Sequence, residues 1–126
     1  MKDVFVSETK LTPKVILKEG EISLTGRSVP SNPGQFYQPV LKWVEEYNEK
    51  GPGNINIKLN FEYINTASTK WLYNILKILG SSPDSKNKLN ISWYFEDGDD
   101  DMQELGSIFK SIVPSKFEII KTSATI

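Results

Sequence analysis

The sequence predicts a small α/β sandwich, in which helices pack on a mixed β-sheet. Residues 54–64 alternate strictly between polar and apolar side chains, as a strand with one buried face does. Two shorter strand-like runs precede this segment, and segments with an apolar stripe at helical spacing lie on both sides of it. In order, the elements follow β-β-α-β-α-β-α-β over 126 residues, which we expect to form a single domain, 1–126.

The first half is expected to contain a hairpin, a helix and the alternating strand. Residues 14–17 and 21–25 are strand-like and are joined by a short polar turn, which is typical of a β-hairpin. After a loop rich in proline and glycine, residues 35–49 form the first predicted helix, whose apolar stripe consists of Phe36, Val40, Trp43, Val44 and Tyr47. In the strand at 54–64, the predicted buried face carries Ile55, Ile57, Leu59, Phe61 and Tyr63.

The second half alternates helices and strands. A helix is predicted over 66–79 and is followed by a turn at 81–88. A strand over 89–95 then leads through an acidic loop into a third helix, which has Met102, Leu105, Phe109 and Ile112 on one face. A short strand at 117–120 closes the fold, and residues 121–126 are expected to be a loose tail.

Composition limits the chemistry that this chain can perform. Its 15 basic and 16 acidic residues give no reason to expect nucleic acid or an anionic membrane as a partner. With no histidine and no cysteine, a Ser-His-Asp triad, a thiolate nucleophile and a zinc site with imidazole or thiolate ligands are excluded. The absence of cysteine fits a cytoplasmic protein. We expect a binding or regulatory module without a cofactor or a metal, and not an enzyme.

Three hydroxyl side chains lie where the alternating strand meets the second predicted helix. With Asn65 as the N-cap, spacing of about 100° per residue places Ser68 in the middle of an apolar face that also contains Ala67 and Trp71. Thr66 falls almost opposite, on the side that carries Lys70 and Tyr73, and Thr69 lies at the margin. Thr66 is therefore the hydroxyl that is predicted to face outward.

A phosphate on Thr66 would meet unpaired first-turn N–H groups and the positive end of the helix dipole. Lys70, one turn further along, lies on the same side of the helix and could approach it. The alternative is that Thr66 and its neighbours only start the helix, since serine and threonine are common at that position.

Several segments in order resemble the SiaC-type regulatory phosphoproteins of bacteria, which are related in architecture to STAS-domain anti-sigma factor antagonists. The resemblance is carried by GEISLTGRSVP at 20–30, FYQPVLKWVEEY at 36–47, YINTASTKWLYNIL at 63–76 and WYFEDGDDDMQELG at 93–106. The sequence departs from the family pattern at 31–35, where an acidic residue would follow the proline.

The resemblance implies a STAS-like fold and a partner-switching module. In that family the threonine of the Asn-Thr pair that opens the second helix is phosphorylated by a cognate protein kinase, and a PP2C-type phosphatase removes the phosphate. The unphosphorylated form binds and activates a diguanylate cyclase, which promotes cyclic-di-GMP production and biofilm growth. Carried over to this chain, Thr66 is the phosphorylated residue and Asn65 the residue before it.

Other readings remain open. The acidic run at 96–101 could serve a small metal-dependent hydrolase, but it lacks the spacing of an EF-hand loop, and its carboxylates also suit the start of the third helix. A scaffold that is never modified is a further alternative. Tyr73 and Tyr94 fall on polar sides of their elements and are the aromatic residues that we expect to contact a partner, whereas Trp43 and Trp71 are expected in the core.

Overall fold

The computed structural model describes residues 2–51, 53–81 and 89–123, and within them it contains one six-stranded mixed sheet and three helices. The strands are β1 (Val4–Val6), β2 (Lys14–Lys18), β3 (Glu21–Ser28), β4 (Ile55–Ile64), β5 (Leu89–Glu96) and β6 (Lys116–Thr122). The helices are α1 (Pro33–Glu49), α2 (Thr66–Leu79) and α4 (Asp100–Ile112). The predicted fold class is confirmed.

The strands lie in the sheet in the same order as in the chain. β1, β2 and β3 pair antiparallel, and β3, β4, β5 and β6 pair parallel. β1 was not predicted, because three residues are too few to show a clear alternation. Its Val4 pairs with Leu17 and its Val6 with Val15, so it adds an edge strand to the expected hairpin.

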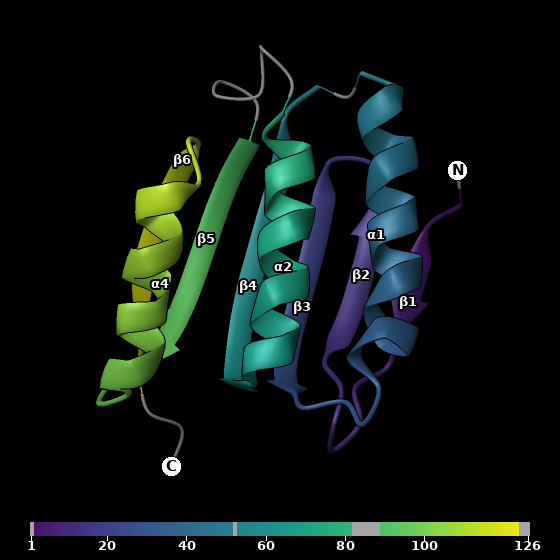
Figure 1. Cartoon of the computed structure of the whole chain (residues 1–126). Helices are drawn as coiled ribbons and strands as arrows, with labels where there is room; N and C mark the ends of the chain where they lie inside the picture. The colour runs from purple at the N-terminus through teal and green to yellow at the C-terminus, as the bar shows by residue number, and fades with distance from the viewer. Residues whose placement is uncertain (1, 52, 82–88, 124–126) are drawn as a thin grey trace.

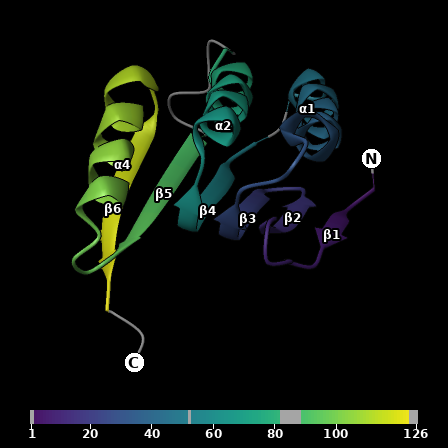
Figure 2. The ribbon, with the colours of Figure 1, turned by 60° about the horizontal axis from the view of Figure 1, so that its bottom comes forward.

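All three helices cover the same face of the sheet, as Figures 1 and 2 show. Each parallel crossover steps in the same direction along the sheet, and right-handed crossovers then place every helix on one side. The hydrophobic core lies between the two layers. The opposite face of the sheet is largely polar, and Asn56, Lys58 and Asn60 of β4 are exposed there.

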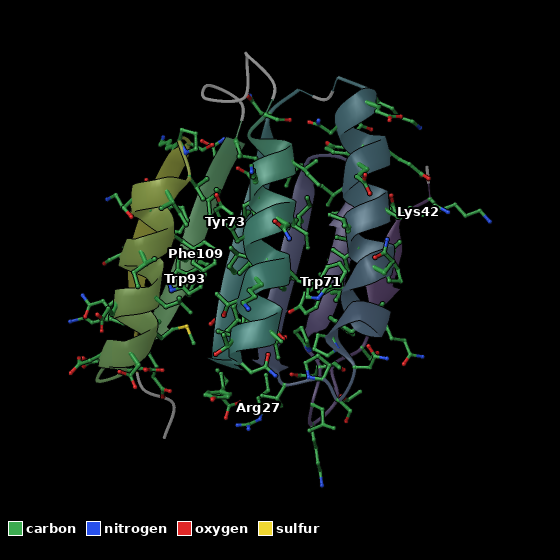
Figure 3. All side chains as sticks on the ribbon, in the orientation of Figure 1. Arg27, Lys42, Trp71, Tyr73, Trp93 and Phe109 are labelled. Carbon is green, nitrogen blue, oxygen red and sulfur yellow. The ribbon has the colours of Figure 1, made fainter. Side chains whose placement is uncertain are left out.

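Trp93 of β5 anchors α4 to the sheet. Its side chain is fully buried, its ring stacks on Phe109 at 5.3 Å between centroids, and its indole N–H donates to the carbonyl of Met102 at 3.0 Å. Figure 3 shows Trp93 and Phe109 together beneath α4. The helix can approach this closely because residue 106 is glycine, since a Cβ there would lie only 2.5 Å from the Trp93 ring.

Near the ends of β4 and α4, two residues that were expected on buried faces are exposed. Tyr63 is 52% exposed, because β4 carries one extra residue where Phe61 pairs with Gly26 and Tyr63 with Arg27. This bulge reverses the alternation, so Ile64 is buried in place of Tyr63. Ile112 is 49% exposed, because the chain leaves the helix there and the next residue takes the buried position.

The ends of the other elements differ little from expectation. α1 begins two residues earlier than predicted, and Tyr37 is buried within it, whereas Phe36 is only half-buried. α2 has the predicted bounds. β6 extends to Thr122, which pairs with Glu96, so the first two residues of the expected tail belong to the strand. Most of the turn expected at 81–88 lies outside the described residues.

The strand-to-helix junctions that bear on function lie at one edge of the sheet. The parallel strands β3, β4 and β5 end at the lower edge in Figure 1, and α1, α2 and α4 begin there. The positive ends of three helix dipoles therefore share the edge at which the strand-to-helix junctions lie.

Candidate functional site

Asn65 fixes the start of α2. Its side-chain oxygen accepts a hydrogen bond from the amide of Ser68 at 2.9 Å, which is the N-cap interaction that the sequence predicts. Its own amide donates to the carbonyl of Ser28 at 3.0 Å. The cap therefore joins the first turn of α2 to the end of β3 as well as satisfying the helix.

The three hydroxyls at this junction have different surroundings, as predicted. Ser68 is fully buried, and Thr69 is half-buried with its hydroxyl donating to the carbonyl of Asn65 at 3.0 Å. Thr66 is exposed, and within the described part of the chain its hydroxyl makes no hydrogen bond. One expectation is wrong: Ala67 is exposed rather than buried with the apolar face. Thr66 is thus the hydroxyl that is accessible to a modifying enzyme.

A buried hydroxyl network, made of Ser28, Tyr37 and Ser68, lies under the start of α2. The Ser28 hydroxyl is 2.5 Å from the phenol oxygen of Tyr37 and donates to the Ser68 hydroxyl at 2.9 Å. Burial raises the pKa of Tyr37 above 10.0, although the hydrogen bonds with both serines act in the opposite direction. Sequence reasoning missed Ser28 and Tyr37; the weak signal was a serine at the end of a buried strand.

Thr66 lies at the rim of a shallow depression of about 420 Å³, which is lined by Thr66, Ala67, Lys70, Trp71 and Asn74. Trp71 is half-buried rather than fully in the core, and its ring stacks on Tyr37 with centroids 6.4 Å apart. Figure 3 shows Trp71 on the side of α2 that faces α1. The surface around the hydroxyl therefore combines an exposed methyl group, part of an indole ring and a lysine.

The electrostatic setting of α2 differs from that of α4. The first turn of α2 contains no acidic residue, whereas that of α4 contains Asp100 and Asp101. Lys70 is exposed one turn after Thr66. Because carboxylates compensate the dipole of α4 but not that of α2, the start of α2 is the better place for an added anion.

The two tyrosines that were expected to contact a partner do not join this site. Tyr73 is half-buried and packs against the core beside a depression between α2 and α4. Tyr94 is half-buried on the sheet face that the helices leave uncovered, since its neighbour Trp93 points into the core. Neither tyrosine lines the depression around Thr66.

The acidic run has a structural role. Asp99 is the N-cap of α4 and accepts a hydrogen bond from the amide of Met102 at 3.1 Å. Among the described residues there is no group of three or more acidic side chains placed to hold a metal ion. In the same part of the chain, no helix is long and apolar enough to cross a membrane.

Comparison with known proteins finds one family. The model of the SiaC family of regulatory phosphoproteins matches residues 6–122. An uncharacterised protein of Pseudomonas aeruginosa strain UCBPP-PA14 is 26% identical over 121 residues, which cover 94% of this chain and 96% of that protein.

The crystal structure of apo-SiaC from Pseudomonas aeruginosa matches with a TM-score of 0.86 at 25% identity, covering 95% of this chain and 99% of that one. SiaC from the same organism has also been solved in complex with the diguanylate cyclase SiaD, of which it is the activator. The matched chain of that complex has a TM-score of 0.86 at 24% identity, and the match covers 95% of this chain and 100% of the matched chain.

Proposed function

The chain belongs to the SiaC family of regulatory phosphoproteins, and from this we propose that it is a non-enzymatic signalling module switched by phosphorylation of Thr66. A cognate protein kinase adds the phosphate and a PP2C-type phosphatase removes it. The unphosphorylated form binds an output protein, for which a diguanylate cyclase is the best candidate because a SiaC of similar fold activates one. We place the module in the cytoplasm, where a kinase has access to ATP.

The observation that carries this proposal is the contrast between Thr66 and its neighbours. Ser68 and Thr69 use their hydroxyls inside the protein, and Thr66 alone of the three is exposed at the first position of α2. A phosphate there would be held by helix N–H groups without disturbing the cap, because Asn65 supplies the cap from outside the helix. Three residues support the site in different ways. Asn65 caps the helix, and Ser68 joins its first turn to Ser28 through a buried hydrogen bond. Lys70 supplies a nearby positive charge.

The phosphate would act on binding through charge and hydration. It replaces a small hydroxyl, set beside Ala67 and Trp71, with a group that carries about −1.5 to −2 charge. An interface that buries this surface would then have to desolvate that charge. We expect phosphorylation to weaken binding of the output protein by at least about tenfold, or 1.4 kcal/mol.

The test is to incubate the protein with its cognate protein kinase and ATP, and then to map the phosphate by mass spectrometry. Phosphate should be found on Thr66 in the wild type and be lost in Thr66→Ala, while Thr69→Ala, which changes the other threonine of this helix, should keep it. Phosphate on Thr69, or none with a kinase shown to be active, would contradict the proposal. Binding to the cyclase is then measured by calorimetry before and after treatment, and again after the phosphatase.

A further inference from the structure

β4 and β5 lie side by side for only part of their length. The ladder between them ends at the pair Leu59–Trp93, and no later residue of β4 pairs with β5. The flanking ladders remain intact, since β3 stays paired with β4 as far as Ile64 and β5 with β6 as far as Thr122. Figure 1 shows β4 and β5 diverging toward their carboxyl ends. The sheet is therefore split at this edge, while strand pairing continues within each of its two halves.

Trp93 is the last residue of β5 that pairs with β4. Its ring packs against Phe61 of β4 at 6.0 Å between centroids, and it also stacks on Phe109 of α4 and on Phe117 of β6. Beyond Trp93, β5 remains paired with β6 alone. β4 instead ends in the junction with α2, where the amide of Asn65 bonds to Ser28 of β3. The bulge near the end of β4 adds local twist to that strand. The two strands thus follow different neighbours, and the space between them is part of the fold.

A cavity of about 540 Å³ occupies this space, within the range of about 300–1,000 Å³ that is typical of ligand pockets. Its walls come from β3 and β4 on one side and from β5, the N-cap of α4 and β6 on the other. We call it the β4–β5 cleft; it is lined by Thr25, Gly26, Asn60, Phe61, Glu62, Glu96, Asp99, Thr122 and Ser123.

The cleft has main-chain hydrogen-bonding capacity. Beyond Leu59, the edge of β4 that would face β5 has no ladder partner among the residues that the structure describes, and the same holds for the edge of β5 at Tyr94. An unpaired strand edge presents a row of N–H and C=O groups to which an extended peptide can pair. The cleft therefore suits a short extended segment better than a compact ligand.

The charges of the residues that line the cleft favour a basic segment. Among the described residues, the lining contains the carboxylates of Glu62, Glu96 and Asp99 and no lysine or arginine. At its margin the guanidinium of Arg27 lies 3.7 Å from Glu62, which shows that a guanidinium can approach this wall. Because the described acidic side chains do not gather into a metal site, cationic groups spread along a chain fit them better than a single ion.

We propose that the β4–β5 cleft binds an extended, basic segment of a partner protein. The main chain of the segment pairs with the open edge of β4, and its arginine or lysine side chains face the carboxylates of Glu62 and Asp99. The cleft is lined by residues at the carboxyl ends of β4 and β5, and Thr66 begins α2 directly after β4, so both lie at the same edge of the sheet and a single partner can contact both. The binding itself does not depend on phosphorylation.

The experiment titrates the isotopically labelled full chain, unphosphorylated, with the capped peptide Gly-Arg-Val-Arg-Gly and follows amide shifts by NMR. The matched peptide replaces both arginines with citrulline, which keeps the shape and removes the charge. The arginine peptide should give saturable shifts at 60–62, 94–99 and 122, with a Kd of about 1 mM. Glu62→Gln combined with Asp99→Asn, which keeps an acceptor at the helix cap, should weaken binding about tenfold.

Glu104→Gln, on the exposed side of α4, is the control and should bind like the wild type. Equal shifts with the citrulline peptide, shifts confined to residues outside the cleft, or no shift at about 10 mM peptide would each overturn the proposal. Because no kinase takes part, failure here leaves the phosphorylation of Thr66 untouched, and failure of that phosphorylation leaves the cleft untouched.

Discussion

The hydroxyl of Ser28, at the end of β3, donates a hydrogen bond of 2.9 Å to the hydroxyl of Ser68 in the first turn of α2. The Ser68 hydroxyl donates to the Ser28 carbonyl at 3.3 Å, and Tyr37 of α1 completes the network. All three side chains are inaccessible to solvent, where polar groups are tolerated only when they are hydrogen-bonded. The network thus fixes α1 and β3 to the helix start that carries Thr66.

Ser68→Ala should lower the free energy of unfolding by about 1–3 kcal/mol. The substitution removes the acceptor of the Ser28 hydroxyl and a donor to the Ser28 carbonyl, and both partners remain buried. Urea denaturation followed by tryptophan fluorescence measures the change. Ser107→Ala, which removes an exposed hydroxyl from α4, should change stability by less than about 0.5 kcal/mol. Equal effects of the two substitutions would contradict the role of the network.

Tyr37→Phe should change how stability depends on alkaline pH. Burial raises the pKa of Tyr37 above its ordinary value of 10.0, so above pH 10 the unfolded chain releases this proton while the folded protein retains it. Wild-type stability should therefore fall as pH rises above 10.0, and Tyr37→Phe should lack that part of the decline. Urea denaturation of both proteins from pH 7 to about pH 11 tests this. A difference between them that does not change with pH would refute it.

Local rules were enough to place α2 and to sort its hydroxyls. Asn65 caps the helix with its own side chain, and the 3.6-residue period decides which way Thr66 and Ser68 point. Both features depend only on residues within one or two turns. The bounds of this helix and the exposure of Thr66 could therefore be predicted before any tertiary contact was known.

The rest of the site depends on contacts between distant segments. Ser28 and Ser68 are 40 residues apart, and only the pairing of β3 with β4 brings them together. The exposure of Tyr63 follows from a bulge, which no alternation of side chains in β4 alone could reveal. The β4–β5 cleft lies where the ladder between β4 and β5 ends at Leu59 and Trp93, and the end of that pairing is likewise invisible in a single strand.

Gly106→Ala should destabilise the protein by about 1–3 kcal/mol. The new methyl group would lie 2.5 Å from the Trp93 ring, which is held on its other sides by Phe109 and Phe117. In an exposed helix position the same change would be stabilising, because alanine favours the helix over glycine. Thermal unfolding by circular dichroism measures the result. An unchanged or higher midpoint would mean that α4 moves away from β5 at little cost.

Lys70→Gln should raise the second pKa of a phosphate on Thr66. In the phosphorylated wild type, the N–H groups of α2 and the ammonium of Lys70 favour the dianion, so its pKa should lie below the usual value of about 6. Removal of the charge on Lys70 removes part of that stabilisation. A pH titration followed by ³¹P NMR measures the pKa of the phosphate directly.

The matched control is Lys77→Gln. Lys77 is exposed on the same helix, almost two turns further from Thr66, so its substitution should leave the pKa of the phosphate unchanged. If Lys70→Gln and Lys77→Gln give the same pKa as the wild type, the helix N-terminus alone holds the phosphate.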